Sequence, residues 1–347
     1  MTRALVTGGA GFIGTNLADR LLREGRRVRI VDNLSRPGVE RNLAWLRERH
    51  GERLEAITGD LRERGLAAEA VRGVDSVFHL AAQVAVTTSL EDPTLDFAVN
   101  LIGTINLLEA ARGLDDPPAF LFTSTNKVYG GLEDVELQDT GSRYEPIAGA
   151  IRRAGISEDR PLDFCTPYGC SKGAADQYVL DYAKSFGLKT AVLRMSCIYG
   201  PHQCGNEDQG WVAHFAIRAL GGAPITLYGD GRQVRDILFV EDLVEAFLLA
   251  RENIEAIGGR AYNMGGGPEN AVSLLDVIER IGELHGTPPE TRFGPWRQGD
   301  QHYYVSDTRR FQQDTGWRPQ VGAEEGIERL YGWLREGVGA GDLVRAA

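Results

Sequence analysis

The chain has little cysteine, no long apolar run and no excess of positive charge. Its four cysteines, among 347 residues, form no C-x-x-C pair and have no histidines at zinc-finger spacing, so we expect reduced thiols and no metal site. No stretch reaches the ~18 apolar residues of a membrane-spanning helix. The first apolar residues give way to glycine too early for a secretory signal, so we expect a cytoplasmic protein without membrane contact.

The charge balance argues against a nucleic-acid partner. Lys and Arg number 38 against 49 Asp and Glu, a formal charge of −11, and an acidic surface disfavours polyanions and anionic lipid. Apolar residues make up 42% and charged residues 25% of the chain, which is typical of a folded globular protein. A small anionic ligand is still compatible with this balance if basic residues gather in a pocket.

Short apolar, β-branched runs alternate with helical patterns through the first 125 residues. The expected strands are Arg3–Thr7, Arg27–Val31, Leu54–Ile57, Ser76–Leu80 and Ala119–Thr123, and the expected helices include Phe12–Arg23 and Asn100–Arg112. Strands separated by helices of this length predict βαβ units and a parallel sheet covered on both faces. The sequence therefore predicts an α/β fold with a doubly wound parallel sheet.

The second half is less regular and predicts a smaller part packed on the first. We expect an ordered loop over Gly131–Thr166, helices over Asp176–Phe186, Leu274–His285 and Ala323–Glu336, and a strand over Thr190–Met195. We assign 1–195 and 228–256 to a cofactor-binding domain. We assign 196–227 and 257–347 to a smaller mixed α/β domain that binds substrate.

Gly8, Gly11 and Gly14 lie between the first expected strand and the first expected helix. In that setting glycine permits a tight turn, close approach of a pyrophosphate, and close packing of helix on strand. Phe12 and Ile13 begin the helix, whose free N–H groups attract phosphate. A plain strand–helix turn is the alternative interpretation. The motif predicts a dinucleotide site on a Rossmann-type fold.

Asp32 ends the second strand, 18 residues after Gly14. A carboxylate there accepts the adenosine ribose hydroxyls and repels a 2′-phosphate, so it favours NAD over NADP. Arg36 is the one residue nearby that could accommodate the phosphate. The expected cofactor-binding set also contains Asn33, Asp60, Leu61, Leu80, Ala81, Ala82, Asn100 and Thr123.

Tyr168 and Lys172 are four residues apart, on one face of an expected helix. A phenol in water has a pKa near ~10, and a neighbouring ammonium stabilises its phenolate. Thr125 closes a sheet strand at the edge where ligands of α/β proteins bind. Tyr129 is a rival base, but it has no lysine at helical spacing. An exposed helical pair is the alternative for Tyr168 and Lys172.

Together these motifs resemble the extended short-chain dehydrogenase/reductases that act on nucleotide sugars, over nearly the whole chain. The resemblance implies NAD as cofactor, with Tyr168 and Lys172 also contacting it. It further implies that Tyr168 is the general base, Lys172 its electrostatic partner and Thr125 a third catalytic hydroxyl. It also implies a homodimer or homotetramer, since dimers are common in this family.

The residues after Thr125 narrow the class of reaction. Sugar 4,6-dehydratases carry Asp-Glu there and uronic acid decarboxylases usually carry Glu, whereas this chain has Asn126 and Lys127. It therefore lacks the carboxylate that elimination needs, which leaves epimerisation. Longer strings resemble the 2-epimerases of CDP-tyvelose and CDP-paratose: 124–130, 167–178, 208–212 and 233–236.

That resemblance implies an isomerase that inverts C2 of a CDP-hexose through a 2-keto intermediate. The expected substrate-binding residues are Asn126, Lys127, Cys197, Gln209, Trp211, Val212, Arg235, Arg297 and Asp300. Many relatives have asparagine where Cys197 stands. A UDP-hexose 4-epimerase is the alternative within enzymes, and a non-catalytic NAD-binding protein is the alternative from another class.

Overall fold

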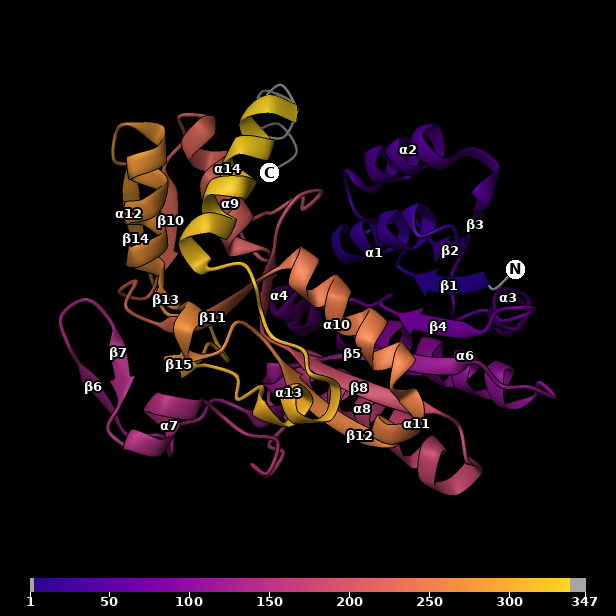
Figure 1. Cartoon of the computed structure of the whole chain (residues 1–347). Helices are drawn as coiled ribbons and strands as arrows, with labels where there is room; N and C mark the ends of the chain where they lie inside the picture. Colours follow the sequence, from indigo (N-terminus) through magenta and orange to yellow (C-terminus); the bar gives the residue numbers. More distant parts are fainter. Residues whose placement is uncertain (1–2, 338–347) are drawn as a thin grey trace.

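The fold is built on one large parallel sheet, seen in a computed structural model that describes residues 3–337 (Figure 1). Seven strands lie in the order β12-β8-β5-β4-β1-β2-β3, and every neighbouring pair is parallel. The strands are β1 (Arg3–Thr7), β2 (Arg27–Asp32), β3 (Leu54–Thr58), β4 (Ser76–His79), β5 (Ala119–Thr125), β8 (Thr190–Met195) and β12 (Arg260–Met264).

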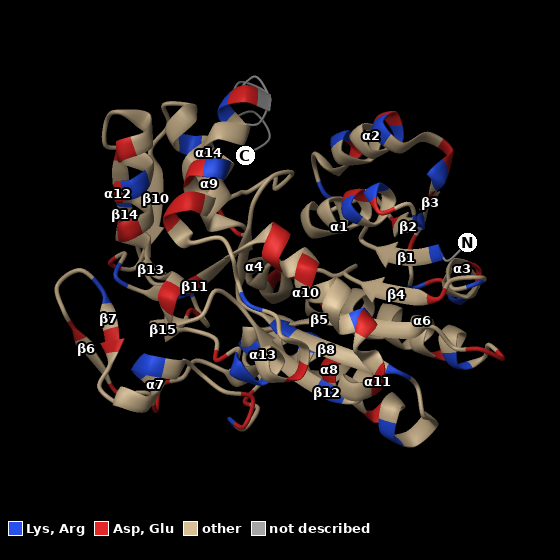
Figure 2. Ribbon diagram, viewed as in Figure 1, with Lys and Arg blue, Asp and Glu red and all other residues tan. Residues whose placement is uncertain are grey.

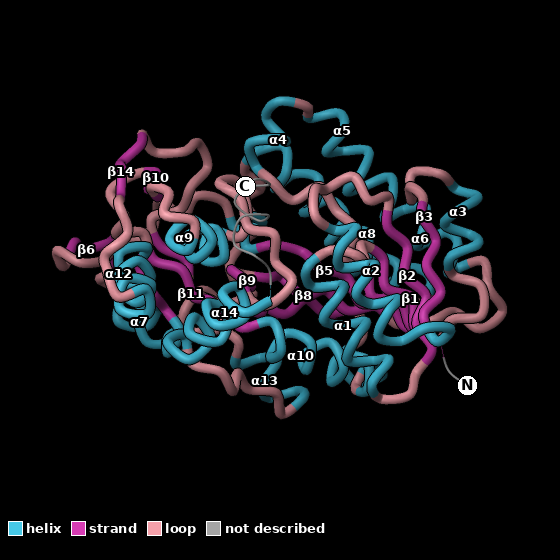
Figure 3. The backbone as a smooth tube through the Cα atoms, turned by 90° about the horizontal axis from the view of Figure 1, so that it is seen from above, coloured by secondary structure: helices cyan, strands magenta, loops and turns pink. Residues whose placement is uncertain are grey.

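Helices cover both faces of this sheet, as the alternation of buried side chains requires (Figure 3). Ala4 and Val6 of β1 face a core shared with α1 (Phe12–Arg23), α2 (Val39–His50) and α10 (Val240–Glu252). Leu5 faces the opposite core, which includes α3 (Arg64–Ala70), α6 (Gly103–Arg112) and α8 (Thr166–Phe186). The expected doubly wound α/β fold is confirmed.

A smaller part of the chain packs beside the carboxyl edge of the sheet. It contains a four-stranded sheet of β9 (Cys197–Tyr199), β11 (Val234–Phe239), β13 (Ala271–Ser273) and β15 (Tyr303–Tyr304), and a parallel pair of β10 (Ile225–Tyr228) and β14 (Thr291–Gly294). Helices α9 (Trp211–Leu220), α12 (Leu274–His285) and α14 (Ala323–Gly337) share one apolar core with β9, β10, β11 and β13. Basic and acidic residues are interspersed on outward helices such as α2 and α14 (Figure 2).

Two strands pair within the other part of the protein than the predicted domain boundaries imply. The sequence assigns residues 257–347 to the substrate part, yet β12 is the edge strand of the large sheet. It assigns residues 228–256 to the cofactor part, yet β11 pairs with β9, β13 and β15. Strand partners are long-range choices that apolar pattern cannot reveal, so this placement of both strands is wrong.

Three local expectations also change. The stretch 131–166 holds a short antiparallel pair, β6 (Leu137–Asp139) and β7 (Tyr144–Pro146), and a helix, α7 (Gly149–Ala154). Helix α8 begins at Thr166, ten residues before the expected start at Asp176, because Pro167 suits the first helical turn. The helix expected from Asn100 opens with a π-helical turn, η2 (Ala98–Ile102).

The remaining elements are short helices that connect the larger ones. They are η1 (Gly51–Arg53), α4 (Val86–Glu91), α5 (Pro93–Phe97), η3 (Asn126–Tyr129), α11 (Ile254–Ile257), η4 (Pro268–Asn270) and α13 (Arg309–Thr315). None of the helices among residues 3–337 is long and apolar enough to cross a membrane. All four cysteines are free thiols.

Asp176 on α8 and Arg194 on β8 form a buried ion pair that predicts a stability effect. The guanidinium donates to both carboxylate oxygens, at 2.9 and 3.0 Å, and the side chains are 0% and 5% exposed. We expect Asp176→Asn to lower the free energy of unfolding by about 3–5 kcal/mol, because it leaves a buried guanidinium without its counter-charge. Chemical denaturation measures this, with the exposed Asp181→Asn as control, expected to change stability by less than ~1 kcal/mol.

Candidate active site

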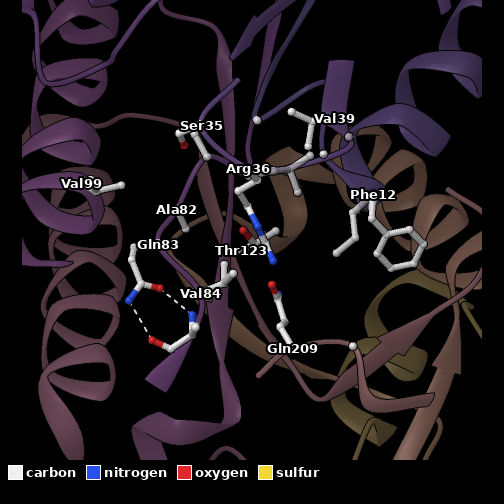
Figure 4. Close-up of a pocket in the computed structure, with 18 of the residues that line it drawn as sticks. Phe12, Ser35, Arg36, Val39, Ala82, Gln83, Val84, Val99, Thr123 and Gln209 are labelled. Atoms are coloured by element: carbon white, nitrogen blue, oxygen red, sulfur yellow. Dashed lines mark hydrogen bonds between the residues drawn. The ribbon is translucent and has the colours of Figure 1, made fainter. Parts of the chain in front are cut away.

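A cavity of about 700 Å³ runs along the carboxyl edge of the large sheet and into the smaller part. Its walls come from the turns after β1, β2, β3, β4 and β5, from the start of α8, and from the segment that leads into α9. Figure 4 shows Phe12 and Val39 on one side and Ser35, Ala82, Gln83 and Val99 on the other. The parallel strands bring these distant segments to one place because their carboxyl ends meet at the same edge.

The glycine turn has the shape that a pyrophosphate needs. Gly8 has φ +64°, and a Cβ there would lie 2.9 Å from the Ala81 nitrogen. A Cβ on Gly14 would lie 2.3 Å from the Gly8 carbonyl oxygen, so only glycine lets α1 pack this closely. Gly11 is the N-cap of α1 and offers no side chain, and the first turn contains no acidic residue. The N–H groups that open the helix therefore remain available to phosphate.

The carboxylates on the adenosine side are held by local hydrogen bonds. Asp32 accepts from the backbone N–H groups of Ala10 and Leu34, at 3.0 and 2.9 Å. Asp60 accepts from the Arg62 guanidinium, which lowers the pKa of Asp60 to about 2. Both carboxylates line the cavity. These acceptors fit NAD, with the Asp32 carboxylate in place to accept from ribose hydroxyls.

Arg36 also lines the cavity, and sequence reasoning named it only for its capacity to accept a 2′-phosphate. Figure 4 shows its side chain and that of Gln209 reaching toward each other inside the cavity. Gln209 approaches from the opposite wall and its Oε1 has no hydrogen-bond partner among the described residues. Arg36 therefore reaches across the cavity toward the segment before α9.

Most of the expected cofactor set lines the cavity. This applies to Gly8, Gly11, Phe12, Ile13, Gly14, Asp32, Asn33, Asp60, Leu61, Leu80, Ala81, Ala82, Thr123, Tyr168 and Lys172. Asn100 is the exception, since it is 1% exposed and its Oδ1 accepts from the backbone N–H of Gln83, at 2.8 Å. The π-helical turn directs Asn100 inward, so Gln83 faces the cavity and Asn100 supports it.

The three expected catalytic side chains meet in the cavity. Thr125 ends β5, Tyr168 and Lys172 lie one turn apart on α8, and all three are at most 9% exposed. The Lys172 ammonium lies 4.2 Å from the centroid of the Phe122 ring. The Thr125 hydroxyl acts on the Tyr168 phenol, whose pKa it lowers. The grouping predicted from the sequence therefore exists in space.

The electrostatics differ from the expectation that Lys172 lowers the pKa of Tyr168. Burial raises the pKa of Tyr168 to about 12, although the Thr125 hydroxyl opposes this. Burial also lowers the pKa of Lys172 to about 7, against the opposite pull of Asp176 and Asp96. The amine is thus only partly charged at neutral pH. In the protein alone, burial outweighs the lysine.

The expected substrate residues divide into two groups. Cys197, Gln209, Trp211 and Val212 line the cavity, and the Trp211 indole donates to the Cys197 sulfur at 3.4 Å. Asn126, Lys127, Arg235, Arg297 and Asp300 lie outside its lining.

The second group forms hydrogen bonds within the protein. Arg235 donates to Asp300 Oδ1 at 2.6 Å, and Lys127 Nζ donates to the Gly299 carbonyl at 3.0 Å. Arg297 donates to the Glu207 carbonyl at 2.9 Å and lies over the Tyr228 ring. These five residues therefore do not line the cavity itself, and their part in substrate binding stays a prediction. Sequence spacing could not show that the segment around Asp300 packs behind η3.

Sequence reasoning missed several residues of the cavity wall. Gln83, Gln203 and Ser196 all line it, and Gln203 follows β9 far from any recognised motif. Gln83 follows the recognised Leu80–Ala82 segment and Ser196 precedes the expected Cys197, so their positions were the usable signals. Within residues 3–337, no three His, Cys, Asp or Glu side chains are arranged to hold a metal ion.

A glycine turn, a ribose-binding carboxylate and a Tyr/Lys pair on one cavity define an NAD-binding Rossmann-type enzyme. The chain belongs to the NAD dependent epimerase/dehydratase family, whose sequence profile matches residues 4–265. It is 40% identical over 338 residues to the CDP-paratose 2-epimerase of Salmonella typhi, which covers 95% of this chain and 98% of that protein. NAD is the cofactor of this family.

Other relatives act on other nucleotide sugars. The chain is 35% identical over 336 residues to a UDP-glucose 4-epimerase of Mycolicibacterium smegmatis, covering 96% of this chain and 98% of that one. A crystal structure of the UDP-glucose 4-epimerase of Thermus thermophilus with NAD superposes with a TM-score of 0.81 at 36% identity, over 97% of this chain and 100% of that chain.

Replacement of a glycine in the turn is predicted to cause a selective loss of the bound cofactor. We expect Gly14→Ala to release most of the bound NAD, because the new methyl would collide with the Gly8 carbonyl that shapes the phosphate cradle. Gly65→Ala is the matched control, since a Cβ there meets nothing within 4 Å. The dinucleotide retained by each purified protein is measured after denaturation. Full retention by Gly14→Ala would contradict the assignment.

Proposed function

We propose that this enzyme inverts C2 of a CDP-linked hexose of the paratose/tyvelose type, by transient oxidation to a 2-keto sugar and re-reduction. The observation that carries the proposal is the Asn126–Lys127 pair directly after the catalytic strand. Neither residue supplies the carboxylate that elimination needs, which leaves hydride removal and return. The 40% identity to CDP-paratose 2-epimerase supports CDP and C2.

The chain supplies a proton acceptor and its supports. Tyr168 takes the proton of the sugar hydroxyl, while Thr125 hydrogen-bonds the reacting oxygen. Bound NAD would supply the hydride acceptor and a positive charge that favours the phenolate. Lys172 stabilises that phenolate and Tyr168 later returns the proton. No further acid or base is required, in agreement with Asn126 and Lys127.

Binding of the nucleotide diphosphate is proposed for the basic group beside the cavity. Lys127 and Arg235 form ion pairs with one carboxylate, that of Asp300. Both cations also act on Cys197 in the cavity wall, where they lower the pKa of the thiol against the effect of burial. Two cations against one carboxylate leave a net positive charge, which attracts a diphosphate. Gln209, Trp211 and Val212 are proposed to line the base pocket.

A UDP-hexose 4-epimerase is the second candidate. The observation in its favour is the full-length similarity to two UDP-glucose 4-epimerases, at 35% and 36% identity. The same Tyr168, Lys172 and Thr125 would serve that reaction. The two candidates differ in the nucleotide that is bound and in the sugar carbon that the cavity presents.

A homodimer or homotetramer is also proposed. Large apolar side chains are exposed on neighbouring helices of one region: Leu95, Phe97, Ile102, Tyr178 and Phe186. Helix α8 packs against α5 and η2, so these side chains belong to adjoining elements. Burying such a surface against a second copy is favourable.

Tyr168→Phe is expected to lower kcat by about 10²–10⁴-fold, because the ring still packs but no hydroxyl transfers the proton. Binding of CDP and NAD should persist. Tyr129→Phe is the control, since its buried hydroxyl bonds Asn263 at 2.7 Å and takes no part in the chemistry. A Tyr168→Phe enzyme that keeps more than about a tenth of the wild-type rate would remove Tyr168 from this role.

The position of epimerisation is tested with a CDP-hexose that is deuterated at C2. We expect epimerisation at C2 with the label retained there in ordinary water, because the same hydride leaves and returns. NMR of the product reads both the configuration and the label. Exchange of the label with solvent would mean deprotonation without hydride transfer, and inversion at C4 of a UDP-hexose instead would favour the second candidate.

A further inference from the structure

A buried chain of side-chain hydrogen bonds leads away from the catalytic threonine. Thr125 Oγ1 donates to Asn126 Oδ1 at 3.3 Å, and Asn126 Nδ2 donates to Gln301 Oε1 at 3.1 Å. Gln301 Nε2 then donates to the Gly130 carbonyl at 2.6 Å. Asn126 is 8% exposed and Gln301 is 0% exposed. The chain joins the end of β5 to the segment before β15.

The direction of every bond in this chain follows from its last member. A backbone carbonyl can only accept, so Gln301 must present its NH₂ group to Gly130 and its oxygen to Asn126. Asn126 must then present its own NH₂ group to Gln301. Its oxygen is left facing Thr125. The two amides cannot turn over without leaving two buried oxygens in contact.

Two acceptors compete for the single hydroxyl proton of Thr125. Its oxygen already accepts the Lys127 backbone N–H, at 3.2 Å. Its proton goes to Asn126 Oδ1 over 3.3 Å, which is long for an O–H···O bond. Tyr168 lines the same cavity as Thr125, and the Thr125 hydroxyl lowers the pKa of the Tyr168 phenol. The proton is therefore held loosely, and a phenolate would accept it more strongly than a neutral amide.

We propose that Asn126 and Gln301 are positioning residues, which aim the Thr125 proton and hold it weakly enough to be given to Tyr168 or the reacting oxygen. This rests on the proposed function, because it assigns Thr125 its part in proton transfer. It also gives Asn126 a role other than contact with the sugar. A carboxylate at this position would bind the Thr125 proton firmly and add a negative charge beside the phenol.

The proposal is tested by replacing each amide with its acid, in Asn126→Asp and Gln301→Glu. A protonated acid reproduces the amide pattern, since it donates through its O–H and accepts through its carbonyl. An ionised acid only accepts. In the Asn126→Asp variant the new carboxylate would trap the Thr125 proton, and in the Gln301→Glu variant it would repel the Gly130 carbonyl. We therefore expect kcat of both variants to fall as pH rises.

The charged and titratable groups around the introduced acids determine the pH at which kcat falls. They are Lys127, Arg235, Asp300, Asp163 and Tyr168. Burial and Asp300 raise the pKa of each acid, whereas Lys127 and Arg235 lower it. The acid form supports the fold, so its folded-state pKa exceeds the unfolded value. Stability present below the unfolded pKa is then lost as pH rises through the folded pKa.

The measurement is kcat and KM of NAD-loaded enzyme between about pH 5.5 and 9, with melting temperature recorded alongside. We expect at least an about tenfold loss of kcat in both variants on the alkaline side, with KM within about threefold, and recovery on acidification. Gln233→Glu is the matched control. Gln233 is also a buried glutamine that donates to a backbone carbonyl, Tyr228 at 2.7 Å, outside this chain. It should lose stability without a new ionisation in kcat.

A purely structural role would give a different result. If Asn126→Asp and Gln301→Glu lose stability like Gln233→Glu but keep a wild-type pH profile of kcat, the proposal is overturned. The comparison uses whichever nucleotide sugar the wild type turns over. The proposal for Asn126 and Gln301 therefore stands even if the C2 or CDP assignment fails, and failure of one can be told from failure of the other.

Discussion

The parallel direction of the seven strands is the constraint on which the rest of the structure depends. Because β1, β2, β4 and β5 all end at one edge, the glycine turn, Asp32, Ala81 and Thr125 meet there without any contact in sequence. A parallel sheet must be buried on both faces, and this forces apolar strands and crossover helices. The site therefore lies at an edge of the sheet, where the strands end, and not on either covered face.

Burial creates the central tension of the site. Neither an isolated phenolate nor an isolated ammonium is favourable in this environment, as the pKa values of about 12 for Tyr168 and about 7 for Lys172 indicate. Between these values both groups are neutral. The charge state of each group therefore depends on the charge of what binds beside it.

Local features of the fold were predictable from the sequence, and long-range ones were not. The bounds of β1, α1, β8 and α12 match their apolar periodicity residue for residue. The glycine turn follows from its spacing between a strand and a helix, and the Tyr168/Lys172 pair from its spacing together with that dinucleotide motif. The three-residue strands within 131–166 are too short to show a period. The layer formed by Lys127, Arg235 and Asp300 depends on a segment about 170 residues after η3, and no local pattern encodes that meeting. The hydrogen bond between Asn126 and Gln301 could not be predicted for the same reason.

The path of the chain between its two sheets has a consequence for recombination. After β8 the chain enters the smaller sheets with β9 to β11, returns to the large sheet with α10 and β12, and leaves again with β13. A gene fusion with a single crossover point cannot exchange the sugar-facing part with that of a relative, because it would also replace an edge strand of the cofactor-binding sheet. Chimaeras that aim to transfer sugar specificity need several junctions, placed on both sides of α10 and β12.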